Sequence, residues 1–179
     1  MNQELDRYPK PSLTVDCVIF GYAEGNLSIL LLQRNEDPYS GSWTLPGGFL
    51  KLEESCADAA RRILSSKTNI EGVFLEQLYT FDHPERDPRG RVLSVAYYAL
   101  VNSEHYALAA GEAVRDMRWW PWEQLPELGF DHAEIIAKAI ERLRSKIQWQ
   151  PIGFELLKPP FTMPELQSLY ECILKTTFD

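Results

Sequence analysis

The residues of this sequence whose types and spacing best suit chemistry begin in one glycine-containing loop. The loop, residues 43–49, reads WTLPGGF and ends six residues before Ser55, where the sequence predicts a helix to begin. Gly47 and Gly48 allow backbone N–H groups to approach a bound molecule closely, and Phe49 offers an aromatic face for stacking. This loop therefore predicts a ligand site near the start of the helix.

Two opposite charges follow the loop. Glu54 lies six residues after Gly48, and Arg62 lies eight residues further on, within the predicted helix. A solvated helix face is the alternative explanation for such residues, because Asp58 and Arg61 have the i,i+3 spacing of a surface ion pair. On spacing alone, both interpretations of Glu54 and Arg62 remain open.

A second group of candidate residues lies between two predicted strands. Arg86, Arg89 and Arg91 place three guanidinium groups within six residues of an acidic protein. The planar arginine fork suits bidentate contact with phosphate or carboxylate. A charged hairpin turn is the alternative, and composition alone favours it, since Asp-Pro and Arg-Gly are ordinary turn sequences. Arg34, at the end of another predicted strand, is compatible with either phosphate binding or a surface charge.

Strands and helices that would position these residues alternate along the chain. The residue patterns predict strands at 13–21, 27–32, 73–81, 92–101 and 114–120. They predict a helix at 55–67, whose apolar stripe consists of Cys56, Ala59, Ala60, Ile63 and Leu64, and a second helix from Asp131, capped by Asp131 and Glu134, whose apolar face consists of Ala133, Ile136, Ala137, Ile140, Leu143 and Ile147. A third, apolar helix follows the capping sequence 162–165 in the tail. This order is typical of an α/β sandwich.

Composition and charge exclude several classes of protein. The 179 residues are 45% hydrophobic and 25% charged, and 26 acidic against 18 basic residues give a net charge of −8. Such a charge opposes non-specific binding to nucleic acid or to an anionic membrane. Three scattered cysteines without a C-x-x-C motif argue against disulfides or a zinc site and fit a reducing cytoplasm. We therefore expect a cytoplasmic protein without a membrane partner.

The loop and helix together resemble the Nudix box of Nudix hydrolases. That box reads G-x5-E-x7-R-E-U-x-E-E-x-G-U, where U is a bulky aliphatic residue, and it is matched here by Gly48, Glu54, Arg62, Leu64 and Ile70. The resemblance implies a Nudix fold of the α/β class, with a mixed β-sheet sandwiched between helices.

Four positions of the box depart from the family pattern. They hold Ile63, Ser66, Lys67 and Asn69, and the first three project from one side of a helix. In active family members, carboxylates there hold Mg²⁺ or Mn²⁺ against a diphosphate. Magnesium requires oxygen ligands, and Lys67 adds an ammonium that repels a divalent cation. We therefore expect no metal, cofactor or catalytic residue. The alternative is an active Mg²⁺-dependent hydrolase that recruits carboxylates from elsewhere.

Further segments resemble one branch of the Nudix proteins. These are residues 75–81, 86–91, 94–98, 128–132 and 151–157. The branch includes ADP-ribose pyrophosphatases and the Nudix-related transcription regulators called NrtR, which sense ADP-ribose and bind DNA through a C-terminal winged helix. Residues 161–170 are similar to the opening helix of that winged helix.

The resemblance implies a domain organisation and a set of partners. Residues 1–148 would form the Nudix domain, and residues 149–179 a linker and the first helix of a truncated winged-helix-like segment. The effector would be ADP-ribose or a related nucleotide or sugar, DNA would bind only if a complete winged helix follows residue 179, and the protein would be a homodimer. The predicted ligand-binding residues are Arg34, Gly47, Gly48, Phe49, Glu54, Arg62, Arg86 and Arg89.

Overall fold

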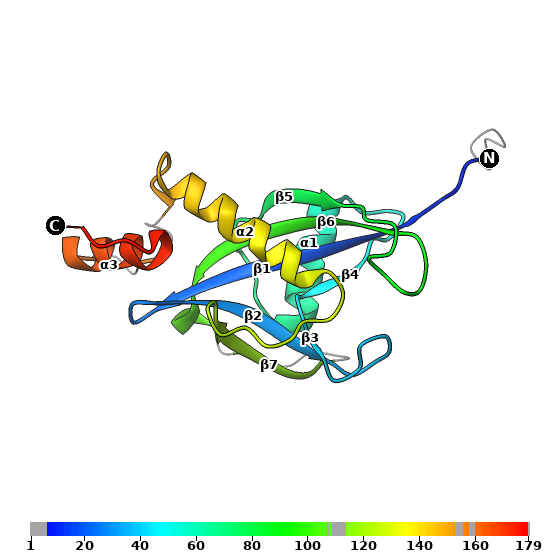
Figure 1. Cartoon of the computed structure of the whole chain (residues 1–179), viewed down its shortest axis with the longest axis horizontal. Helices are drawn as coiled ribbons and strands as arrows, with labels where there is room; N and C mark the ends of the chain where they lie inside the picture. The colour runs from blue at the N-terminus through cyan, green and yellow to red at the C-terminus, as the bar shows by residue number, and fades with distance from the viewer. Residues whose placement is uncertain (1–6, 107, 109–113, 153–155, 158–159, 179) are drawn as a thin grey trace.

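The computed structural model describes residues 7–106, 108, 114–152, 156–157 and 160–178. Its elements in chain order are β1 (Ser12–Ala23), β2 (Asn26–Arg34), β3 (Trp43–Thr44), β4 (Gly47–Phe49), α1 (Cys56–Thr68), β5 (Glu76–Phe81), β6 (Val92–Asn102), the short 3₁₀ helix η2 (Ser103–His105), β7 (Val114–Pro121), α2 (His132–Ile147) and α3 (Met163–Leu174) (Figure 1). The predicted α/β fold, a mixed sheet between helices, is confirmed.

The central strand of the sheet is β1, which is apolar on both faces. Val15, Cys17 and Ile19 face one core cluster, and Val18 and Phe20 face the other. Successive side chains of a strand point to opposite faces, so a strand with this pattern must be covered on both sides. It pairs in parallel with β6 over almost its whole length.

The other edge of β1 changes partner halfway along the strand. Residues 20–23 pair with β2 beside the turn, whereas residues 14–16 pair with β4. β2 also pairs with β7 along residues 28–34, and further from the turn residues 32 and 33 pair with β3. The first half of β1 and the second half of β2 therefore have different neighbours, and this divergence opens the sheet where the glycine loop enters it.

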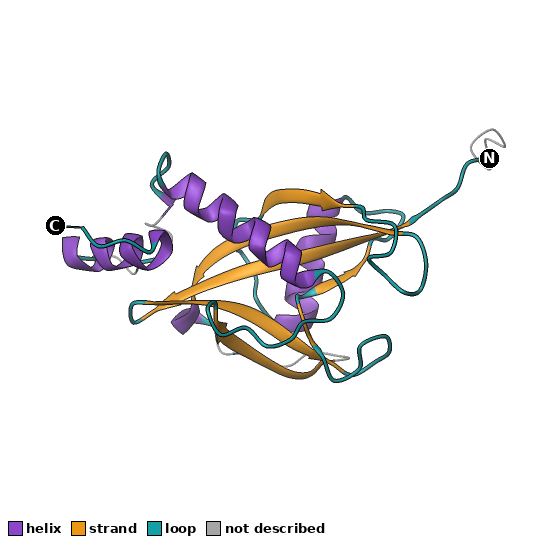
Figure 2. Ribbon diagram, in the orientation of Figure 1, coloured by secondary structure: helices purple, strands orange, loops and turns teal. Residues whose placement is uncertain are grey.

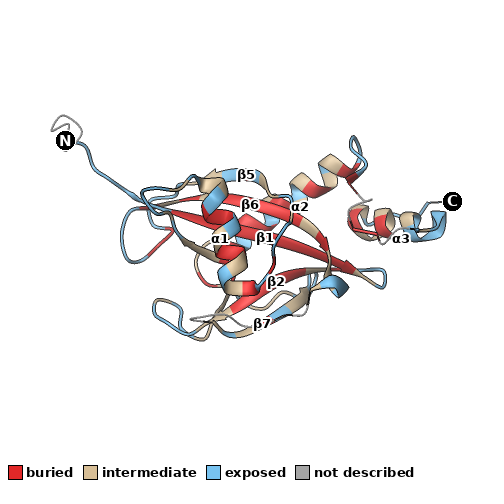
Figure 3. Cartoon of the chain, turned by 180° about the vertical axis from the view of Figure 1, so that it is seen from behind, coloured by how far each residue is buried: buried red, intermediate tan, exposed pale blue. Residues whose placement is uncertain are grey.

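Helices cover both faces of the sheet (Figure 2). One face packs against α1, which is seen in front of the buried strands in Figure 3, and the other packs against α2. Among the described residues, no helix is long and apolar enough to cross a membrane.

The apolar face predicted for the second helix is partly wrong. Ala133 and Ala137 are exposed, whereas His132, Ile135 and Ala139 are buried. Alanine tolerates either environment, so two alanines at the border of a stripe do not fix the orientation of a helix. The predicted cap at Asp131 is also wrong in detail, because its side chain makes no cap hydrogen bond.

The predicted cap of the first helix is confirmed. The Ser55 side chain accepts a hydrogen bond from the Asp58 N–H, and α1 begins at Cys56. Two short strands were missed, because the loop 43–49 contains β3 and β4. The strand predicted at 73–81 is shorter than expected and begins only at Glu76. Strands of two or three residues are too short to produce a detectable alternation.

The C-terminal helix packs on the main domain, as its apolar stripe requires. Thr162 and Glu165 form the predicted capping box, and Leu169 and Ile173 are fully buried in the core cluster that contains α2. Arg144 of α2 donates a hydrogen bond to the Ile173 carbonyl at 3.1 Å. Residues 153–155, 158 and 159 of the predicted linker lie outside the described residues.

Candidate ligand-binding site

A pocket of about 200 Å³ lies where β1 and β2 diverge, and most of the predicted site residues line it. Its lining includes Thr14 and Asp16 of β1, residues 32–36, Thr44, Leu45, Gly47, Gly48, Phe49, Lys67, Arg86, Asp87, Arg89, Val114, Phe130 and His132. Two predicted residues, Glu54 and Arg62, are absent from this lining. The volume is below the roughly 300–1,000 Å³ of common ligand sites. A nucleotide-sized ligand therefore has to extend out of the pocket or displace a side chain.

Close packing leaves no room for a side chain at Gly47 and little room at Gly48. A Cβ atom at Gly47 would lie 1.9 Å from Asp16 Oδ1, and one at Gly48 would lie 3.3 Å from Ile63 Cγ1. The loop therefore passes directly over β1 and α1, with its backbone at the pocket. A role of these glycines in ligand binding stays a prediction.

Glu54 and Arg62 form an ion pair with each other. Arg62 Nε and Nη2 donate to the two carboxylate oxygens at 2.8 and 2.5 Å, and Nη2 also donates to the Phe49 carbonyl at 3.0 Å. The hydrogen bonds from Arg62 lower the pKa of Glu54 to about 2. This pair fastens the glycine loop to α1, and direct ligand contact by either residue stays a prediction.

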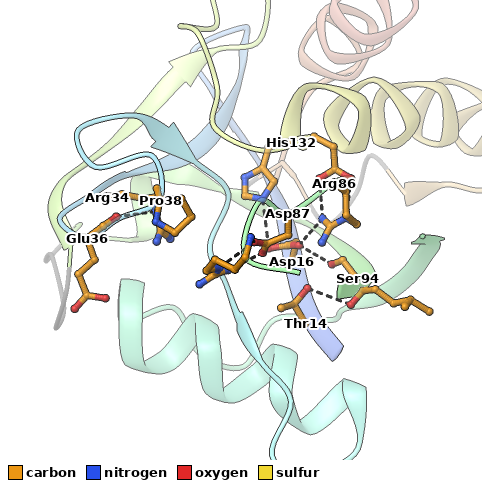
Figure 4. A network of polar contacts seen from close by, with 12 residues as sticks. Thr14, Asp16, Arg34, Glu36, Pro38, Arg86, Asp87, Ser94 and His132 are labelled. Carbon is orange, nitrogen blue, oxygen red and sulfur yellow. Dashed lines mark hydrogen bonds and ion pairs between the residues drawn. The ribbon is translucent and has the colours of Figure 1, made fainter. Parts of the chain in front are cut away.

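Arg86 is buried in a network of charges behind the pocket (Figure 4). Its guanidinium donates two hydrogen bonds to Asp131, at 2.8 and 2.7 Å, and lies 3.5 Å from Asp16. Asp16 also accepts a hydrogen bond from Ser94 at 2.5 Å. Arg86 thus ties the β5–β6 loop to β1 and to the start of α2, and this pairing explains why Asp131 does not cap its helix.

Arg89 and Arg34 present their charges to the pocket. The Arg89 guanidinium makes a bidentate ion pair with Asp87, at 2.9 and 2.7 Å, and lies over the rings of Phe49 and Phe130, at 5.1 and 5.7 Å. Its hydrogen bonds lower the pKa of Asp87. Arg34 lies 5.2 Å from the Phe130 ring centroid and donates to the Pro38 carbonyl at 2.8 Å.

Sequence reasoning missed Phe130 and His132 as pocket residues. Phe130 has a φ of +58°, a conformation that costs a non-glycine residue energy and that is enriched at functional sites. His132 is buried, its Nδ1 accepts a hydrogen bond from the Leu45 N–H at 2.9 Å, and its Nε2 lies 3.6 Å from Asp16. Burial lowers the pKa of His132. The only available signal was the resemblance of residues 128–132 to one Nudix branch.

At the helix positions that carry carboxylates in active Nudix proteins, the side chains of this chain pack in the core or form hydrogen bonds to backbone carbonyls. Ile63 is buried beneath Gly48, and Ser66 donates to the Ile63 carbonyl at 3.3 Å. Lys67 Nζ donates to the Gly47 carbonyl at 2.6 Å. No group of three or more His, Cys, Asp or Glu side chains suited to a metal occurs in the described part of the chain. An aliphatic, a hydroxyl and an ammonium do not fit Mg²⁺, which binds through carboxylate oxygens.

The last departure from the box has a conformational explanation. Asn69 ends α1 with a φ of +56°, the left-handed conformation that glycine adopts most readily. Asparagine is the common substitute at this position of a helix, so the turn is retained.

A mixed sheet between helices, with a glycine loop tied by a Glu–Arg pair to the following helix, defines a Nudix domain. The chain belongs to this family, because the family described as NUDIX domain matches residues 10–142.

The chain is similar to a transcriptional repressor and to solved structures of an NrtR. The ADPR responsive transcriptional repressor NtrR of Acinetobacter baylyi is 39% identical over an alignment of 171 residues that covers 93% of this chain and 68% of the repressor. Shewanella oneidensis NrtR, solved with a 27mer DNA, is 38% identical with a TM-score of 0.82 and coverage of 93% and 77% of the two chains. The Nudix domain of that NrtR, solved with ADP ribose, is 36% identical with a TM-score of 0.69 and coverage of 80% and 99%.

The buried network predicts a large effect of removing Arg86. Arg86→Ala leaves Asp16 and Asp131 without their cation, and breaking a buried pair in this way costs about 3–5 kcal/mol. Denaturant unfolding is expected to detect this loss. The control Arg61→Ala removes an exposed ion pair on α1 and is expected to cost no more than about 1 kcal/mol. Equal effects of the two substitutions would contradict the structural role of Arg86.

Burial of His132 predicts a pH-dependent stability. Below about pH 6.5, the ordinary pKa of histidine, His132 of the unfolded chain binds a proton that the folded chain excludes. The free energy of unfolding therefore decreases as the pH is lowered. His132→Asn keeps an acceptor for the Leu45 N–H but removes the titration. Between about pH 7 and about pH 5.5, we expect the unfolding free energy of the variant to fall less steeply than that of the wild type. Parallel profiles would show that the Asp16 and Asp131 carboxylates keep His132 protonatable in the folded state, against its burial and the charges of Arg86 and Arg34.

Proposed function

We propose that this chain is the ligand-sensing Nudix domain of an NrtR-like transcription regulator, which binds ADP-ribose or a related nucleotide or sugar effector without efficient hydrolysis. The observation that carries the proposal is the composition of α1 beside the pocket. Ile63, Ser66 and Lys67 occupy the positions from which active Nudix proteins hold a divalent cation. A pocket that could hold a ligand is present beside these residues, and Lys67 lines it.

The pocket has the groups that an anionic nucleotide requires. Arg34, Lys67 and Arg89 line it, and the Phe49 and Phe130 rings offer faces for stacking a base. The two relatives that are named for a response to ADPR or for a complex with ADP ribose support this choice of effector.

The regulatory part of the proposal concerns the C-terminal segment. We infer that residues 1–148 form the effector domain and that residues 149–179 form a linker and the first helix of a winged-helix-like segment. DNA binding would require the rest of a winged helix, and the NrtR structure with a 27mer DNA supports DNA as the partner. A homodimer in the cytoplasm fits a regulator of this kind.

An isothermal titration with ADP-ribose, paired with an assay for AMP release in Mg²⁺, tests the proposal. We expect saturable binding and no AMP release above the protein-free rate. Arg89→Ala is expected to weaken binding roughly ten- to a hundredfold, because a charge-assisted contact to phosphate is lost. Arg61→Ala, on the exposed surface of α1, serves as the matched control and should bind like the wild type.

Two outcomes would contradict the proposal. AMP release at enzyme-like turnover would favour the rival function, an active metal-dependent pyrophosphohydrolase. Flat titrations with ADP-ribose and with a panel of nucleotide sugars would indicate a scaffold domain that binds no small molecule.

A further inference from the structure

We propose that the Lys67 ammonium takes the place of the divalent cation, so that the domain holds the diphosphate of its nucleotide ligand without a metal. This inference rests on the proposed function, because it concerns the same pocket and the same class of ligand. It adds Lys67 to the predicted ligand-binding residues. It also implies that the residue which replaces a metal-binding carboxylate of the box takes part in binding the ligand.

The position of Lys67 is the first support. Its side chain extends from the last turn of α1 to the pocket, where Nζ donates to the Gly47 carbonyl at 2.6 Å. An ammonium has three N–H donors. Among the described residues, the Gly47 carbonyl is the only acceptor for Nζ. Two donors therefore remain for phosphate oxygens at the edge of the glycine loop.

The charges around Lys67 are the second support. Its partly buried ammonium shares the pocket with Arg34, and burial together with the charge of Arg34 lowers the pKa of Lys67. An anion bound beside these two cations would offset both effects. Two carboxylates of the lining do not compete strongly, since Asp87 is paired with Arg89 and Asp16 lies beside Arg86 and accepts from Ser94. The third, Glu36, offsets only part of the effect of burial and Arg34 on the pKa of Lys67.

The surroundings also disfavour a metal at the same place. Ile63 packs under Gly48 and supplies no oxygen ligand, and the Ser66 hydroxyl donates within its own helix. Glu54, the nearest retained box carboxylate, has both oxygens engaged by Arg62. A divalent ion at this place would have to displace the Lys67 ammonium. The box carboxylates that would offset the cost of dehydrating the ion are absent at positions 63, 66 and 67.

Calorimetric titration of the chain with ADP-ribose, once in EDTA and once in Mg²⁺, tests this inference. We expect the wild type to bind equally well in the two buffers. Lys67→Met, which keeps an unbranched stem, should weaken binding roughly ten- to a hundredfold in EDTA, and Lys67→Arg should retain most of the affinity. Lys51→Met, which removes an exposed lysine outside the pocket, should bind like the wild type.

The outcomes separate this inference from the proposed function. Wild-type binding that requires Mg²⁺, or Lys67→Met binding like the wild type in EDTA, would overturn the role of Lys67 and leave effector binding intact. No binding in either buffer would overturn both proposals. An unchanged thermal unfolding temperature of Lys67→Met would establish that its loss of affinity comes from the missing charge. A lowered temperature with restored affinity in Lys67→Arg would lead to the same conclusion.

Discussion

The hydrogen bond from the Lys67 ammonium to the Gly47 carbonyl is the interaction on which the chemistry of the pocket depends. It places a fixed positive charge between α1 and the glycine loop, where the Nudix pattern would otherwise concentrate negative charge. A pocket with that charge attracts a diphosphate directly and repels a divalent ion. Under the proposed function, the lysine at this box position would both prevent metal-dependent hydrolysis and support binding of the ligand.

The contact exists because the sheet opens at one place. β1 exchanges β2 for β4 near Asp16, and only glycine at position 47 permits the loop to cross so close to that carboxylate. The charge that this crossing buries is balanced by Arg86, which also engages Asp131 at the start of α2. The pocket wall, the β5–β6 loop and α2 are consequently joined by ion pairs whose partners are nearly inaccessible to water. α2 also packs against α3, the helix proposed as the first of the winged-helix-like segment.

The sequence predicts the elements of this fold better than it predicts the partners of its charged residues. The amphipathic stripes of α1 and α3 were predictable because each has a clear period and a capping residue at the start of the helix. The central strand was predictable from its run of apolar residues. Arg86 and Arg89 lie in the predicted loop, but only the structure reveals that one is buried against Asp131 and the other lies over Phe130. Those partners are 45 and 41 residues away in sequence. Charge spacing along a chain carries no information about contacts at that separation, and so Phe130 and His132 were missed.

The central claim is that α1 provides no site for a divalent cation in the presence of the nucleotide. Electron paramagnetic resonance of Mn²⁺ measures this most directly, because only the free ion gives the sharp spectrum. In a titration of Mn²⁺ into protein with ADP-ribose, the signal should fall no further than it does with ADP-ribose alone. Stoichiometric loss of the signal that depends on the protein and is abolished by Glu54→Gln would contradict the account.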